Sequence, residues 1–266
     1  MGTSGAFGGS PGWKRIKDQT QEWLNDVGGE GGGSGTTTPP IPPEPKLETP
    51  ESRPPGRRLA PIAPAIASVI SALGRALTSG GSGGGGGGSS VPNDQGRSVA
   101  RASAVGGRAL GGAYGARSGV AEPLGELGLD LAELAGLTRY QQAQRILDAA
   151  IGPRGDVLDS ELRQTNASVV LWALTEEVEP APVELANRWV VEYVWEVWIT
   201  ESGPTLQQHS TNGNDRLQTE QEMRAALEAT VSAHALPEDR TLTSADFAAA
   251  IESALSSLRR ISGSAA

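Results

Sequence analysis

Few residues in this chain are of the types that usually carry catalysis or bind metal ions. It has no cysteine and two histidines, His209 in a polar stretch and His234 before Pro237. Disulfides, thiolate nucleophiles and thiolate metal sites are therefore excluded, and the histidines form neither a His-x-x-x-His nor a His-Glu-x-x-His ligand pair. Paired acids such as Glu176 and Glu177 are typical of charged helix surfaces. We therefore expect no catalytic residues, no bound metal, no cofactor and no enzymatic activity of the chain's own.

The N-terminal amine is the one group for which the sequence predicts a reaction. Because Gly2 is small, methionine aminopeptidase is expected to remove Met1 and to leave an unhindered glycine amine that can enter a narrow active site. A myristoylation signal requires Ser or Thr at the sixth position, where this chain has Ala6. The alternative interpretation is an ordinary flexible terminus.

A cluster of aromatic residues is the other candidate binding feature. It consists of Trp189, Tyr193, Trp195 and Trp198, which could stack on nucleic-acid bases. A base-stacking site would be expected to interleave Arg or Lys, but Arg188 is the only cation among three glutamates. The pattern favours packing in a hydrophobic core, and a groove for a partner is the remaining alternative.

The amine and the aromatic cluster belong to parts of the chain that Gly and Pro separate. Most of the 36 glycines and 18 prolines lie in the first 120 residues, in stretches that cannot bury enough apolar surface to fold. We predict an N-terminal leader and amphipathic helix at 1–27, a Pro/Gly-rich linker at 28–60, a short helix at 61–78, a poly-Gly linker at 79–96 and a helical domain at 97–266. A fragment that begins after residue 96 is expected to fold, unless the first helices belong to the core.

The first helix must be supported by another part of the protein. Trp13, Ile16, Trp23, Leu24 and Val27 recur at nearly helical spacing, with charged residues between them. A helix this short is only marginally stable in water. Because linker sequence follows it, we expect it to dock elsewhere.

The segment from 97 to 120 places small residues at an unbroken spacing of four. They are Ser103, Gly107, Gly111, Gly115 and Gly119. In a helix this spacing forms a face with almost no side chains, which another backbone can approach closely. The favoured interpretation is a helix clamped against a partner or against the chain's own bundle. The alternative is a flexible Gly-rich linker.

The residues after Pro123 predict conventional helices, and with them an all-α fold. Thr138 and Gln141 form a capping-box pattern for a helix that ends at Gly152, and further helices are expected at 156–178 and 183–200. Two more are expected, one capped by Thr219 with Glu222 and one that begins near Asp246. The fold class is therefore a C-terminal helical bundle preceded by a flexible Gly/Pro-rich N-terminal half.

The charge distribution bears on partners and on location. Residues 1–120 contain 12 Lys and Arg against 8 acidic residues, whereas residues 121–266 contain 10 against 23. An acidic folded half repels phosphate and anionic lipid, so we expect no membrane contact and at most indirect contact with nucleic acid. No secretory signal is recognisable, because Lys14, Arg15 and Lys17 interrupt the apolar residues near the start. We expect a cytoplasmic protein.

Several motifs together resemble a known family. They are Met1-Gly2-Thr3-Ser4, Phe7-Gly8-Gly9, Gly12-Trp13, the Gly-rich helix from Val105 to Val120, Leu158-Asp159-Ser160 and Tyr193-Val194-Trp195-Glu196. In these motifs the chain resembles the B component of the Qat bacterial anti-phage defence system. The long Pro-rich stretch and the separate poly-Gly tract depart from that family, so the resemblance does not extend to the middle of the chain.

The resemblance implies a non-catalytic subunit that works beside an ATPase, a QueC-like enzyme and a TatD-like nuclease. It also implies that the QueC-like partner modifies the amine of Gly2 with a deazaguanine group. Residues predicted to bind partners are Thr3, Ser4, Phe7 and Trp13 around the leader, and Gly107, Gly111, Gly115 and Gly119 on the glycine face. The alternatives are a general scaffold protein and a nucleic-acid-binding helical module that uses Arg97, Arg101, Arg108 and Arg117.

Overall fold

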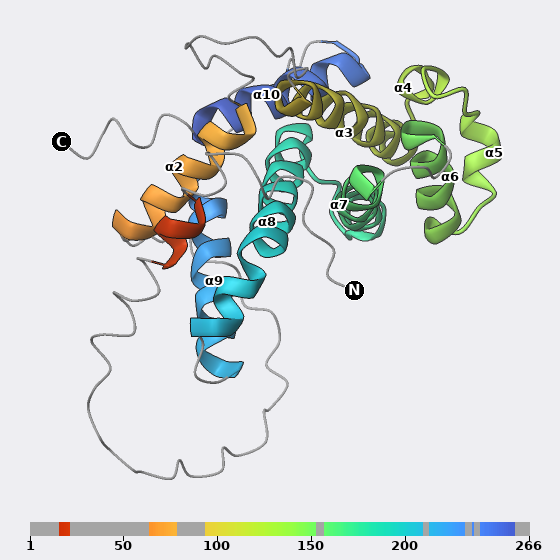
Figure 1. Ribbon diagram of the computed structural model, residues 1–266. Helices are drawn as coiled ribbons and strands as arrows, with labels where there is room; N and C mark the ends of the chain where they lie inside the picture. Colours follow the sequence, from red (N-terminus) through yellow and green to blue (C-terminus); the bar gives the residue numbers. More distant parts are fainter. Residues whose placement is uncertain are drawn as a thin grey trace, which may run out of the picture.

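The computed structural model describes residues 16–21, 64–78, 94–152, 157–209, 213–231, 236 and 240–258. Within these ranges every regular element is a helix, which confirms the all-α fold class (Figure 1). Besides a helical stretch at 16–21, the helices are α2 (Pro64–Thr78), α3 (Asp94–Ser118), α4 (Ala121–Gly125), α5 (Leu131–Ala135), α6 (Arg139–Ile151), α7 (Val157–Thr175), α8 (Pro182–His209), α9 (Gly213–Thr230) and α10 (Ser244–Leu258). None of these helices combines the length and the apolar character that crossing a membrane requires.

Helix α3 is the element around which the others are arranged. It packs against α10, α7, α6 and α4, and α10 runs along it in Figure 1. A Cβ atom added at Gly107 would lie 2.5 Å from the carbonyl oxygen of Ser244 and 2.7 Å from the amide nitrogen of Ala248, both in α10. The segment is thus a helix clamped within the chain's own bundle, and the alternative of a flexible linker is wrong.

Glycines on the other sides of α3 leave room for large side chains of neighbouring helices. A Cβ atom at Gly106 would lie 2.6 Å from the ring of Trp189, and one at Gly112 would lie 2.8 Å from the side chain of Ile146. Each glycine costs up to about 1 kcal/mol relative to alanine in an isolated helix. The close packing of α8, α6 and α10 against α3 offsets that cost.

Helix α8 supplies the centre of the core, as its aromatic content predicts. Trp189 and Trp198 are fully buried, and Trp189 stacks on Tyr193 with 5.1 Å between the ring centroids. The indole N–H of Trp189 donates a hydrogen bond of 2.7 Å to Asn166 in α7. This bond satisfies a donor whose burial without a partner would be costly. Core packing is therefore the role of Trp189, Tyr193 and Trp198, whereas Trp195 is half-buried.

Helix α8 is longer than the predicted segment at 183–200, since it continues through Pro204 to His209. A proline inside a helix removes one backbone hydrogen bond and costs about 3 kcal/mol. The last turns nevertheless bury Leu206 completely, so apolar packing stabilises the continuation.

Local capping signals were partly correct predictors of helix starts. Thr138 and Gln141 form the reciprocal capping box that begins α6. The predicted cap at Thr219 is wrong, because α9 begins at Gly213 and Thr219 is buried within it.

The short helices α4 and α5 were not predicted. Each is a single turn of five residues, which is too short to show helical periodicity.

Helix α2 belongs to the same hydrophobic core as the helices after residue 97. Its side chains Val69, Ile70 and Leu73 are fully buried, and the helix packs against α10, α3 and α9. The predicted short helix at 61–78 is thus present from Pro64 onward. A fragment that begins after residue 96 would lack one wall of the core.

We predict that Gly107→Ala lowers the free energy of unfolding by about 1–3 kcal/mol, because the added methyl group meets backbone atoms of α10 that cannot rotate away. Gly125→Ala is the matched control, since a Cβ atom there has nothing within 4 Å. The measurement is urea unfolding followed by circular dichroism. Equal stability of the two variants would show that α10 does not pack closely on this face.

We also predict a pH-dependent stabilisation at the start of α10. The hydrogen bond from Arg240, reinforced by hydrogen bonds from Thr243, lowers the pKa of Asp246 from 3.8 to about 2, although partial burial opposes the shift. A lowered pKa means that this stabilisation is complete above about pH 4 and is lost as the pH falls towards 2.

Asp246→Asn should therefore lower the free energy of unfolding at pH 7 by about 0.5–1 kcal/mol, the usual effect of an acid at a helix start. The difference between wild type and variant should shrink between pH 4 and pH 2 in urea unfolding. A difference that stays constant over this range would contradict the assignment.

Candidate functional site: the docking surface of the N-terminal helix

The helical stretch at 16–21 docks on the bundle and forms the candidate functional site. Ile16 and Thr20 lie one turn apart on the same face, and both are fully buried. Figure 1 shows this stretch beside α2, at the end of the molecule where α9 lies. The predicted need of the N-terminal helix for a docking surface is met here. We call the surface formed by Ser68 of α2 and Glu201 of α8 the N-terminal docking surface.

Two polar contacts orient the docked helix. Lys17 Nζ lies 3.5 Å from Glu201 Oε2. The side-chain amide nitrogen of Gln19, Nε2, donates a hydrogen bond of 3.0 Å to the Ser68 hydroxyl. The Glu201 side chain is 2% exposed, whereas the Lys17 side chain is 38% exposed. The cation thus sits at the edge of the interface and covers a carboxylate that is almost completely removed from water.

Several buried polar atoms in this interface have no hydrogen-bond partner in the part of the chain that the structure describes. They are Glu201 Oε1, Gln19 Oε1 and Thr20 Oγ1. A buried acceptor without a partner costs roughly 1–3 kcal/mol. This cost offsets part of the gain from burying Ile16. Docking therefore depends strongly on Lys17, which is the cation that compensates the charge of Glu201.

The predicted leader residues Gly2, Thr3, Ser4, Phe7 and Trp13 lie outside the described residues. The same holds for the linkers predicted at 28–60 and for most of the segment at 79–96.

The predicted partner-binding role of the glycine face needs correction. Ser244 and Ala248 of α10 cover Gly107 and Gly111, and α4 together with Val120 covers Gly115. Gly119 ends α3 with a φ of +71°, a conformation that favours glycine. The face was correctly predicted as a contact surface at Gly107, Gly111 and Gly115, but α10 and α4 of the same chain occupy it there, and Gly119 is exposed.

The arginines proposed for nucleic-acid binding differ in their surroundings. Arg117 donates hydrogen bonds to the carbonyl oxygens of Glu176 and Glu177 and so ties α3 to the end of α7. Arg101 and Arg108 are exposed on α3, and the side chain of Arg97 is not described. Of the three arginines whose side chains are described, Arg117 is therefore tied to the chain itself, whereas Arg101 and Arg108 lie two turns apart on the exposed side of α3.

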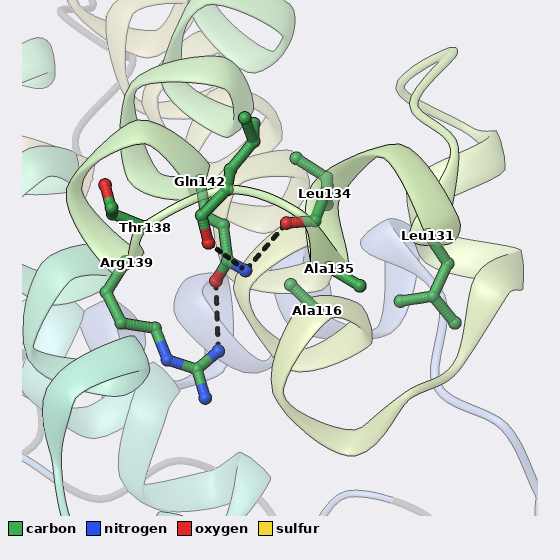
Figure 2. A pocket seen from close by; sticks show the side chains of 8 residues that line it. Ala116, Leu131, Leu134, Ala135, Thr138, Arg139 and Gln142 are labelled. Carbon is green, nitrogen blue, oxygen red and sulfur yellow. Dashed lines mark hydrogen bonds between the residues drawn. The ribbon is translucent and has the colours of Figure 1, made fainter.

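A cavity of about 400 Å³ lies between α3, α5 and α6 (Figure 2). The side-chain amide of Gln142 donates to the carbonyl oxygens of Leu134 and Leu137 at 2.8 and 3.3 Å, and its oxygen accepts from Arg139 at 3.0 Å. Figure 2 shows these bonds along one wall, with Ala116 and Leu131 across the opening. Gln142 is thus fully used in holding the connection between α5 and α6. Among the described residues, no group of three or more His, Cys, Asp and Glu could hold a metal ion.

Comparison of the chain with models of protein families, with curated proteins and with solved structures finds no match. The site is therefore argued from its own geometry. Sequence reasoning did not single out Lys17 and Glu201 as a pair, because each resembles an ordinary charge on a helix surface.

We predict that Lys17→Met loosens the docked helix by about 1–3 kcal/mol, because it leaves the buried carboxylate of Glu201 without a cation. Amide hydrogen exchange in residues 16–21 should become about fivefold to a hundredfold faster. Asp18→Asn is the control in the same turn, since Asp18 is exposed.

Combining Lys17→Met with Glu201→Leu should restore much of the protection, because replacing both charges removes the unpaired buried group. Unchanged exchange in Lys17→Met would contradict the role of this ion pair.

Proposed function

We propose that this chain is a non-catalytic adaptor subunit of a multi-protein bacterial antiviral complex, and that it presents its N-terminal glycine to a partner enzyme. The observation that carries the proposal is the docking of residues 16–21 through Ile16, Thr20 and the Lys17–Glu201 ion pair. A docked helix gives the preceding residues a defined origin on the bundle. Once Met1 is removed, the fourteen residues from Gly2 to Arg15 would span about 50 Å at most if fully extended, which is enough to reach into the active site of a bound enzyme.

The resemblance to the B component of the Qat system supplies the identity of the partners. On this proposal the QueC-like enzyme attaches a deazaguanine group to the amine of Gly2, and Thr3 and Ser4 enter its active site with that amine. Phe7 and Trp13 anchor the leader behind it. The ATPase and the TatD-like nuclease of the same system complete the assembly, which works in the cytoplasm.

The arrangement of charges supports an adaptor over a nucleic-acid-binding module. Arg117, one of the four arginines that such a module would use, already bonds carbonyl oxygens of the chain itself. Residues 121–266 carry 23 acidic residues against 10 basic ones, and this excess repels phosphate. Genes for an ATPase, a QueC-like enzyme and a TatD-like nuclease beside this one would support the adaptor directly.

We predict that Gly2→Glu abolishes protection against phage and leaves thermal melting unchanged. The bulky residue should prevent removal of Met1 and so block the amine, while the docked helix and the bundle remain intact. Intact-mass analysis of the wild-type protein, co-expressed with its partners, should show an adduct. Tryptic digestion should then place this adduct on the first peptide.

Gly5→Glu is the matched control, because it adds the same charge to the leader and leaves the amine of Gly2 available. An unmodified wild-type terminus, together with a Gly2→Glu variant that still protects cells, would refute the proposed modification.

A further inference from the structure

Two tryptophan–arginine pairs lie side by side across α7, α8 and α9. The guanidinium carbon of Arg188 is 4.3 Å from the ring centroid of Trp172, and that of Arg224 is 5.9 Å from the ring centroid of Trp195. Both distances are within the range of cation–π attraction. The two rings are half-buried, so each keeps part of its surface open to solvent.

Glu192 joins the two pairs into one network. Its carboxylate is paired with Arg224 and lies 4.0 Å from Arg188 Nε. Glu192 is 7% exposed, so the ion pairs are anchored in the body of the protein. The positions of both guanidinium groups are thus set before any partner arrives, which reduces the entropy lost on binding.

Glu196, one turn further along α8, is the carboxylate of this surface that takes part in no ion pair with the described side chains. It accepts a hydrogen bond of 3.2 Å from Gln164, and none of the ion pairs among the described side chains includes it. Partial burial and the neighbouring charge of Glu192 raise the pKa of its carboxyl group, and together they outweigh the opposite effects of the hydrogen bond from Gln164 and of the charge of Arg224. A cation placed here would relieve both effects.

The charges of the surface favour a protein partner over nucleic acid. Arg224 pairs with Glu228 as well as Glu192, and Arg188 lies beside Glu192. Both guanidinium groups therefore already face carboxylates, and the half-buried Glu196 would repel a phosphate. Tryptophan and arginine are the residues most enriched at the energetic centres of protein interfaces.

We infer that Trp172, Arg188, Glu192, Trp195, Glu196 and Arg224 form a docking surface for a partner subunit. The segment that fits it carries a lysine or arginine that pairs with Glu196, flanked by apolar side chains that cover the exposed parts of the two tryptophan rings. Because the partner is taken to be another subunit of the antiviral complex, the inference rests on the proposed function. It adds a contact that is separate from the N-terminal leader.

The test uses the full chain co-expressed with the ATPase, the QueC-like enzyme and the TatD-like nuclease, followed by affinity measurement with the purified subunit that it retains. Glu196→Lys should weaken binding at least tenfold, because it places a cation against the partner's cation. Glu196→Gln should weaken it less. Glu252→Lys is the matched control, since it makes the same charge change at an exposed position of α10 and should leave affinity unchanged.

Trp172→Ala provides a second variant that removes apolar contact without a change of charge, and it should also weaken binding at least tenfold. Melting curves confirm that each variant is folded. Equal affinity of wild type and Glu196→Lys would overturn the docking surface while leaving the adaptor function intact. Failure of the wild-type chain to bind any of the three subunits would overturn the adaptor function, and the docking surface with it.

Discussion

The packing of the helices depends on the glycines of α3, which have no Cβ atom. Gly107 brings the backbone of α10 close enough that a methyl group would lie 2.5 Å from a carbonyl oxygen, and Gly106 admits the ring of Trp189 in the same way. Backbone atoms cannot move aside as a flexible side chain can, so these contacts set the spacing of the helices. The buried face of α8 and the position of α10 both follow from this packing.

The N-terminal docking surface is a consequence of that arrangement. Helix α10 packs against both α3 and α2, and α2 supplies Ser68 while α8 supplies Glu201. The bundle therefore buries the carboxylate of Glu201 where the N-terminal helix docks. Lys17 of the N-terminal helix compensates its charge, which links the start of the chain to its core. On the proposed function, this link gives the leader a fixed origin.

The features that the sequence could predict are those encoded by neighbouring residues. Helical periodicity located most of the long helices, and the reciprocal contacts of Thr138 and Gln141 are local by nature. The cap predicted at Thr219 failed because a local motif also occurs inside helices, where tertiary packing decides the boundary. The ion pair of Lys17 with Glu201 joins distant segments, and only the fold reveals that the carboxylate is buried. The glycine spacing indicated close packing without identifying α10 as its partner.

On this structure, the N-terminal helix is held at one place on the bundle. Because the chain has no cysteine, spin labels can be placed uniquely at Gln21→Cys and Gln221→Cys, two exposed positions in the N-terminal helix and in α9. Pulsed electron paramagnetic resonance then measures the distribution of distances between the labels. A docked helix predicts a single narrow distribution. A broad distribution, as expected for an untethered segment, would contradict the account.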